Sequence, residues 1–350
     1  MSGGPGSRPG DAASTGLANG SLLLRDAPSI PGLHFRLYRG PGDHPGMVHV
    51  RNEHALASED TELRSVEGMD NDYARLTNCH PYRDVLVAEV DGTIVAYARV
   101  SWEDQNGGGR AYELLGFMDP AWGHRGIGRT MLHHQLRRAR AIRAAHADIG
   151  ESWLGSWAED GNPGAMALLL SEGFRVVRRF PLMVRPHLDA IDIPPLPDGL
   201  EVRPVSRSDW RAIFEAMVEA FRDHFGGVDG SEDGYQRWIG GPEFQPALFQ
   251  VAWDGDQVAG AILNAINKAE NERLGRSSGW LATVFTRRAW RQRGLARALI
   301  GRSLVLLREQ GMTSAQLGVD QDNPNQALRL YEESGFRVVT SSSAFRRDWD

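Results

Sequence analysis

The chain contains two copies of one unit, and this internal repeat constrains its fold more than any other feature. The segment EGFRVVRRF around Gly173 returns as SGFRVVTSS around Gly335, an offset of 162 positions. RGIGRTML around Gly126 returns as RGLARALI around Gly294, an offset of 168 positions. Two landmarks at nearly the same offset indicate a duplicated domain, because the repeats of solenoid proteins are only about 20–45 residues long.

Composition marks the borders of the two units. Four prolines and a glycine interrupt any periodic pattern between residues 185 and 200, so we expect a linker there. We therefore expect an N-terminal domain at 32–186, a linker at 187–199 and a C-terminal domain at 200–350. Residues 1–31 are rich in Gly, Ser, Pro and Ala and lack the apolar core of a signal peptide, which predicts a disordered leader.

Each unit shows the same order of expected elements, β-α-α-β-β-β-α-β-α-β. Two β-rich runs on either side of Asp254 and Gly255 predict a hairpin. A helix is expected from about 294 to 310, because its apolar residues share one face: Ala296, Leu299, Ile300, Leu304 and Leu307. The pattern predicts an α/β protein, a mixed sandwich in duplicate.

Charge and cysteine content exclude several classes of protein. The net charge of −6 argues against broad nucleic-acid binding, which depends on neutralising phosphates. Cys79 is the only cysteine, so a disulfide framework or a thiolate metal cluster is excluded. No apolar run approaches the roughly 20 residues that span a bilayer. We expect a cytoplasmic protein that binds no nucleic acid, membrane or metal, and the sequence is compatible with a homodimer.

The stretch WRQRGLARAL at 290–299 places two arginines and a glycine at the start of an expected helix. The first N–H groups of a helix have no partner within it, and the helix dipole favours an anion there. Gly294 would let the backbone approach a ligand closely, and Arg291 and Arg293 could hold a phosphate. Taken alone, the motif is more typical of a basic helix start in solvent.

The loop, the strand before it and the segment after it together resemble the GNAT superfamily of acyl-CoA-dependent N-acetyltransferases. In that family R/Q-x-x-G-x-G/A wraps the pyrophosphate of CoA, and this motif stands here at 291–296. LATVFT at 281–286 matches the splayed strand of the family, and the segment 320–336 matches its second motif. The resemblance covers both halves, and the tandem arrangement is similar to that of mycothiol synthase and its relatives.

The resemblance implies two tandem GNAT-fold domains, each with a mixed, mostly antiparallel central sheet flanked by helices. It also implies acetyl-CoA as co-substrate. The residues that it implies for cofactor binding lie in the strand, the loop and the second motif: Val284, Phe285, Thr286, Arg291, Gln292, Arg293, Gly294, Leu295, Ala296, Arg297 and Asn323.

The resemblance further implies that Tyr331 protonates the departing thiolate. The base that deprotonates the amine stays open, because GWLATVFT at 279–286 has no carboxylate, whereas the first half keeps Glu113. As candidates for this base we put forward Asp223 and His224, which are neighbours in the sequence. Glu219 and Asp320 are alternatives. A solvated His–Asp pair at a helix end fits the same residues.

The two halves differ at the residues that carry the chemistry. Gly123 stands at the position of Arg291, and Leu169 stands at the position of Tyr331 as a core leucine. Asn162 keeps the place of Asn323 to within one residue. We therefore expect a degenerate N-terminal domain and a catalytic C-terminal domain.

The expected function is transfer of an acetyl group from acetyl-CoA to a primary amine, most readily that of a small molecule. The glycine-rich segment 224–244 is expected to form a mobile lid over the acceptor. Two alternatives stay open at this point: a non-catalytic acyl-CoA-binding or sensing protein, and a protein lysine or N-terminal acetyltransferase. The sequence leaves open the acceptor and the preferred length of the acyl chain.

Overall fold

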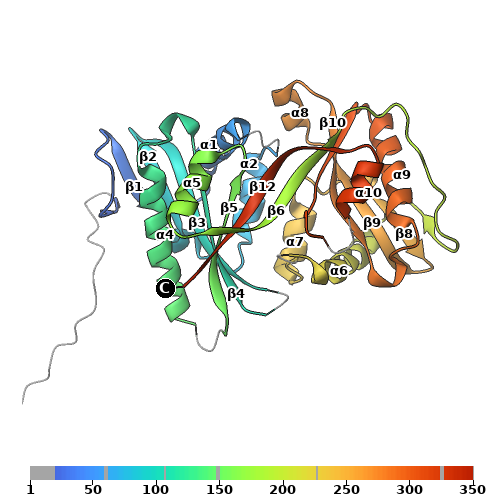
Figure 1. Ribbon diagram of the computed structural model, residues 1–350, viewed down its shortest axis with the longest axis horizontal. Helices are drawn as coiled ribbons and strands as arrows, with labels where there is room; N and C mark the ends of the chain where they lie inside the picture. The colour runs from blue at the N-terminus through green and yellow to red at the C-terminus, as the bar shows by residue number, and fades with distance from the viewer. Residues whose placement is uncertain are drawn as a thin grey trace, which may run out of the picture.

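One sheet runs through the whole molecule (Figure 1). The computed structural model describes residues 20–349 except 59–61, 106–107, 147–149, 226–227 and 324–326. The described strands form a 12-stranded sheet in the order β1-β2-β3-β4-β5-β12-β6-β11-β10-β9-β8-β7. The expected α/β fold in two halves, with a mixed sheet flanked by helices, is confirmed.

The first half contains β1 (Leu33–Leu37), α1 (His44–Ala57), α2 (Val66–Ala74), α3 (Pro81–Asp84), β2 (Val85–Val90), β3 (Thr93–Asp104), β4 (Arg110–Met118), α4 (Ile127–Ala144), β5 (Ser152–Glu159), α5 (Pro163–Ser171) and β6 (Arg175–Arg185). The second half contains β7 (Glu201–Val202), α6 (Trp210–Ala220), α7 (Glu232–Gly240), β8 (Gln250–Asp254), β9 (Gln257–Ala265), α8 (Lys268–Leu274), β10 (Ser278–Thr286), α9 (Leu295–Glu309), β11 (Ser314–Gly318), α10 (Ala327–Glu333) and β12 (Arg337–Asp348).

Helix α8 in the second half, like the short α3 in the first, is an element that the sequence pattern did not predict. The Asn267 side chain accepts a hydrogen bond from the backbone N–H of Glu270 and so caps the start of α8. Gly275 follows the helix with φ 61°, the left-handed conformation that ends many helices. Both signals can be read in the sequence. A helix of only 7 residues between two strands, however, is too short to give a clear helical pattern.

The last strands of the two halves are exchanged. β6 of the first half pairs antiparallel with β11 of the second half, from Ala315↔Arg185 to Gly318↔Leu182. β12 of the second half pairs antiparallel with β5 of the first half and with β6. β6 and β12 therefore cross side by side between the halves and join the two parts of the sheet (Figure 1).

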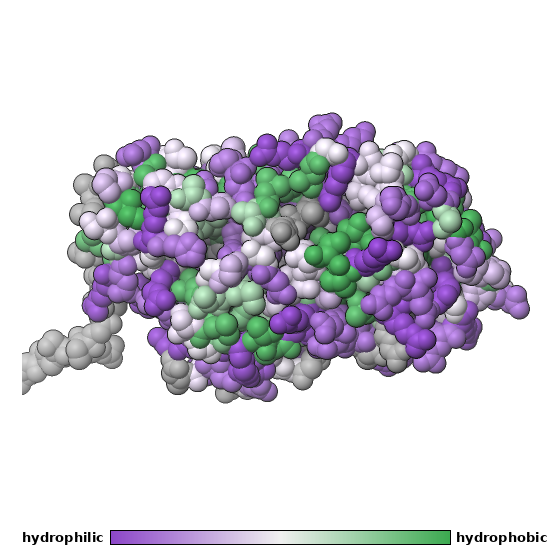
Figure 2. All heavy atoms as spheres, turned by 45° about the horizontal axis from the view of Figure 1, so that its top comes forward, coloured by the Kyte–Doolittle hydropathy of each residue, from purple (hydrophilic) through white to green (hydrophobic). Residues whose placement is uncertain are grey.

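The apolar face predicted for the helix at 294–310 packs onto the sheet as α9. Leu299, Ile300, Leu304 and Leu307 are each at most 1% exposed, which corresponds to about 1.5–3 kcal/mol of stabilisation per side chain. Ala296, at the start of the helix, is only partly buried because it borders a cavity. On the face shown in Figure 2, hydrophilic residues predominate and apolar residues form small separate patches.

The described part of the expected leader, residues 20–31, lies against the first half, and we call it the N-terminal arm. Ser21 forms an isolated bridge with Arg36, and the N–H of Leu22 donates to the carbonyl of Phe35. Three apolar side chains of the arm pack on the cluster that contains Ile127 and Met131: Leu22, Leu24 and Ile30. Residues 1–19 lie outside the described part. None of the described helices is both long and apolar enough to cross a membrane.

Candidate functional site

Two neighbouring strands of the second half separate at the centre of the sheet. β10 and β11 run parallel and pair at three positions, the last being Trp280↔Gln316. Beyond Trp280, β10 stays paired with β9 up to Thr286↔Gly260, after a bulge between Leu281 and Thr283. The edge of β10 at 282–286 therefore faces a gap beside β11, where backbone groups can bind a ligand.

The predicted glycine loop follows β10 and leads into α9. Gln292 has φ 61° and Gly294 has φ 86°, and Gly294 is the residue directly before the helix. Left-handed residues next to a helix start turn several N–H groups in one direction, which suits an anion. A Cβ added at Gly294 would meet no atom within 4 Å, so open space lies in front of the loop.

A cavity of about 630 Å³, which we call the loop cavity, lies over this gap and loop. Of the residues predicted to bind the cofactor, those that line it are Val284, Phe285, Thr286, Arg291, Gln292, Gly294, Leu295, Ala296, Arg297 and Asn323. Phe285 and Leu295 also line it, although they are only 5% and 1% exposed and belong to hydrophobic core clusters. Arg293 is exposed and does not line the loop cavity, and its part in binding stays a prediction.

Arg291 fixes the position of the loop. Its Nε donates to the carbonyl of Thr286 at 3.0 Å, and its Nη2 donates to the carbonyl of Ala220 at 3.2 Å. The guanidinium thus ties the end of β10 to the end of α6. At least two donors of Arg291 hold the protein backbone, and its part in binding a phosphate stays a prediction.

Tyr331 and His224 both line the loop cavity. Tyr331 is 6% exposed, and burial raises the pKa of its phenol, which therefore stays protonated at neutral pH. The amide Nδ2 of Asn323 donates to Nε2 of His224 at 3.1 Å. Burial also lowers the pKa of His224, so both effects keep the imidazole neutral.

The remaining candidates for the base differ in their positions. The side chain of Asp223 lies outside the described part of the structure, so its role stays a prediction. Asp320 lines the loop cavity, but it is buried and its Oδ1 accepts from Nε of Arg178 at 2.8 Å. Glu219 binds Arg287 at 2.7 Å and lines neither of the two cavities described here.

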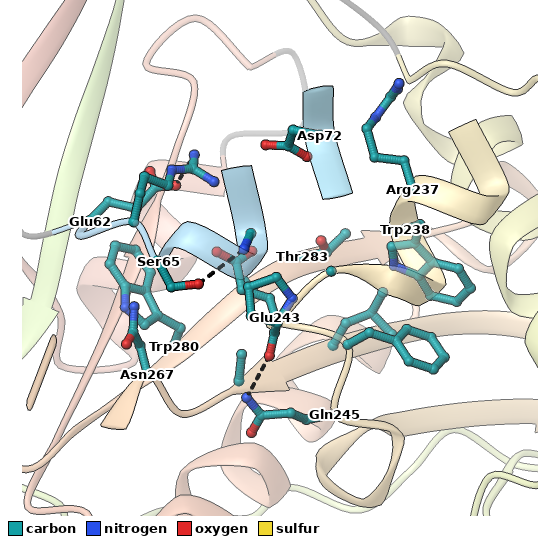
Figure 3. A pocket seen from close by; sticks show the side chains of 18 of the residues that line it. Glu62, Ser65, Asp72, Arg237, Trp238, Glu243, Gln245, Asn267, Trp280 and Thr283 are labelled. Carbon is teal, nitrogen blue, oxygen red and sulfur yellow. Dashed lines mark hydrogen bonds and ion pairs between the residues drawn. The ribbon is translucent and has the colours of Figure 1, made fainter. Parts of the chain in front are cut away.

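A second cavity, of about 930 Å³, is lined by residues of both halves, and we call it the interdomain cavity. Figure 3 shows side chains of the first half, among them Ser65 and Asp72, facing side chains of the second half, among them Trp238 and Glu243. Three residues line both cavities, namely Ala282, Thr283 and Gly318. The two cavities therefore meet at the gap between β10 and β11.

The segment predicted to be a lid contains α7, which forms one wall of the interdomain cavity. Trp238 packs against Phe214 and Phe244, with ring centroids 5.5 Å and 4.7 Å apart. The first half holds the same wall from the other side, because Asn71 Nδ2 donates to the carbonyl of Arg237 at 2.8 Å. Nη1 of Arg237 in turn donates to the carbonyl of Arg75 at 2.9 Å. The shape of the cavity thus depends on both halves.

Sequence reasoning missed Glu270, the carboxylate that α8 brings to the interdomain cavity. Glu270 is 1% exposed, and its Oε1 accepts from Trp280 Nε1 at 3.1 Å and from Gln316 Nε2 at 2.9 Å. Trp280 holds the position that Glu113 holds in the first half, since each is the last residue of its strand to pair with the next parallel strand. Burial raises the pKa of Glu113 to about 7.

The first half differs at the corresponding positions. Leu169, the counterpart of Tyr331, is a core residue with 5% exposure, as predicted. Asn162 caps α5 by accepting from the N–H of Ala165 at 3.0 Å. Within the described ranges, no group of three or more His, Cys, Asp or Glu side chains is arranged to hold a metal ion.

Comparisons with known proteins agree with this architecture. The model of the Acetyltransferase (GNAT) family matches residues 50–174 and 210–336. Mycothiol acetyltransferase from Geodermatophilus obscurus is 30% identical over 269 residues, which cover 76% of this chain and 82% of the relative.

Two solved structures share the fold. A GCN5-related N-acetyltransferase from Sphaerobacter thermophilus aligns with a TM-score of 0.66 at 21% identity, covering 90% of this chain and 95% of that one. A tandem GNAT protein from the clavulanic acid biosynthesis pathway aligns with a TM-score of 0.62 at 15% identity, covering 90% of this chain and 98% of that one. The two family matches span more than half of the chain, and the protein therefore belongs to the GNAT acetyltransferase family as a tandem-domain acyltransferase.

Proposed function

We propose that the enzyme transfers an acetyl group from acetyl-CoA directly to a primary amine of a small molecule, and that the second half carries out the reaction. The observation that carries the proposal is the meeting of the two cavities at Ala282, Thr283 and Gly318. A thioester in the loop cavity and an amine in the interdomain cavity would face each other across this gap. Acyl transfer requires such an approach of the two reactants.

The residues of the loop cavity supply the groups for each step. The amine nitrogen attacks the thioester carbonyl while backbone N–H groups near Val284 and Phe285 stabilise the oxyanion. The C–S bond breaks, and the thiolate takes a proton from the phenol of Tyr331. The proton of the amine passes to Nε2 of the neutral His224 imidazole, directly or through water, and Nε2 then gives up the hydrogen bond that it accepts from Asn323. Asp223 is the second candidate for this role.

The shape of the interdomain cavity supports a small molecule as the acceptor. Its walls come from both halves and are fixed by hydrogen bonds between α2 and α7, so an acceptor must enter a confined space of about 930 Å³. The name of these relatives, mycothiol acetyltransferase, makes small primary amines related to mycothiol the first acceptors to test.

Acetyl-CoA and a panel of small amines, with release of free thiol as the readout, test the proposal. Tyr331→Phe removes only the hydroxyl, and we expect kcat to fall by about 100-fold or more with little change in CoA affinity, because general acid catalysis contributes about 10²–10⁴. Leu169→Val is the matched control, since it alters the same position of the first half and should change stability alone. Turnover by Tyr331→Phe at the wild-type rate would contradict the assigned acid.

A further inference from the structure

The two glycine loops have the same backbone but different surroundings. Gly126 has φ 88° and Gly294 has φ 86°, and the residues two positions earlier, His124 and Gln292, have φ 58° and 61°. Each glycine stands directly before its helix, α4 or α9. The backbone conformation that suits an anion is therefore present in both halves.

We propose that the N-terminal arm closes the glycine loop of the first half, so that one chain binds one CoA, in the second half. The inference uses the proposed cofactor but not the proposed chemistry, since a chain that bound CoA without turnover would behave in the same way. Displacing the arm is then expected to open a second, weaker phosphate site.

In the first half, the arm occupies the space in front of the glycine loop. The corresponding space in the second half is open. A Cβ added at Gly294 would meet no atom within 4 Å, and Gly294 lines the loop cavity. A Cβ added at Gly126, in the same backbone conformation, would lie 3.5 Å from Cβ and 3.7 Å from Cγ of Pro28. These are contact distances between packed carbon atoms, so Pro28 stands where a ligand would approach the loop.

Polar contacts hold the arm at the start of α4. The hydroxyl of Thr130 donates to the carbonyl of Asp26 at 2.6 Å. The carboxylate of Asp26 binds Nδ1 of His133 at 2.9 Å, and Nε2 of the same ring lies 3.1 Å from Glu172. These contacts anchor the arm within the first two turns of α4, next to the loop that Pro28 contacts.

The second half lacks the residues that hold the arm. At the offset of 168 positions, Ala298 stands in place of Thr130 and Gly301 in place of His133. The linker also crosses α9, but it does so at Gly301, where an added Cβ would lie 2.4 Å from the carbonyl oxygen of Asp192. This crossing lies about two helical turns beyond Gly294, so the loop of the second half stays open.

Calorimetric titration of the full chain with CoA, combined with amide hydrogen exchange, tests the inference. We expect one CoA per wild-type chain, with protection of amides at 292–298 and no change at 124–130. Two equivalents, or protection at 124–130, would overturn the closure. Absence of any binding would instead overturn the proposed cofactor.

A double variant, Asp26→Ala with Pro28→Gly, tests whether the arm is the cause. We expect a second and weaker CoA equivalent, together with protection at 124–130. Leu23→Ala is the matched control, because Leu23 belongs to the same arm and is 63% exposed. If the double variant still binds a single CoA, the arm is not what closes the loop. Pro28→Gly alone serves the same test if the double variant does not fold.

Discussion

Gly294 allows the effect of one methyl group on folding to be separated from its effect on binding. Its φ of 86° is unfavourable for any residue with a Cβ, and the added atom would meet nothing within 4 Å. Gly294→Ala should therefore reduce the free energy of unfolding by the conformational cost alone, about 1–2 kcal/mol. The same methyl group would point toward the space in which we place the pyrophosphate. Loss of one hydrogen bond to a charged group, about 1.5–3 kcal/mol, would raise the Kd for CoA roughly 10- to 100-fold.

The control for this variant is Gly311→Ala. Gly311 follows α9 with φ 83°, and a Cβ added there also meets nothing within 4 Å, so the backbone cost should be the same. Thermal unfolding should show similar losses for both variants, whereas calorimetric titration with CoA should show a loss for Gly294→Ala alone. Equal affinities for CoA in the two variants would refute the placement of the phosphate at this glycine.

Three other changes follow from the contacts described above. Glu270→Ala leaves the donors of Arg276, Trp280 and Gln316 without their buried carboxylate. Denaturant unfolding should therefore show that the free energy of unfolding falls by about 3–5 kcal/mol. A decrease as small as that of a surface mutation would contradict this. Arg291→Lys keeps the charge but cannot bridge two carbonyls, so titration should show weaker CoA binding, and unchanged affinity would show that charge alone suffices. The hydrogen bond to Asp26 raises the pKa of His133, so the protonated ring stabilises the arm fully below its unfolded pKa of about 6.5. This contribution is lost as pH rises through the higher folded value, and the stability difference between wild type and His133→Ala, followed by thermal unfolding, should shrink over that range; a difference that grows with pH would contradict it.

Local signals in the sequence predicted much of the second half. The glycine loop, the helix after it and its buried leucines follow from spacing and from the conformational freedom of glycine, which depend on near neighbours. The duplication itself then allowed Leu169 to be identified as a core residue, which the structure confirms.

Features that depend on distant segments could not be predicted in this way. Strand pairing is not encoded in the period of a single strand, so the exchange of β6 and β12 was not expected. The contact between His224 and Asn323 joins residues 99 positions apart. The arm was expected to be part of a disordered leader because of its Gly, Ser and Pro content, although Leu22, Leu24 and Ile30 were an available signal for packing.

The exchange of the last strands gives the molecule the topology of a strand-swapped homodimer whose two subunits have been joined end to end. Each half, if separated at the linker, would lose the partner of its fifth strand and expose an unpaired sheet edge at β5 or β11, which favours aggregation. Even if the first half does not catalyse a reaction, as we propose, it therefore cannot be deleted without cost to the second half. This dependence gives selection a structural reason to retain both domains, whichever of them catalyses the reaction.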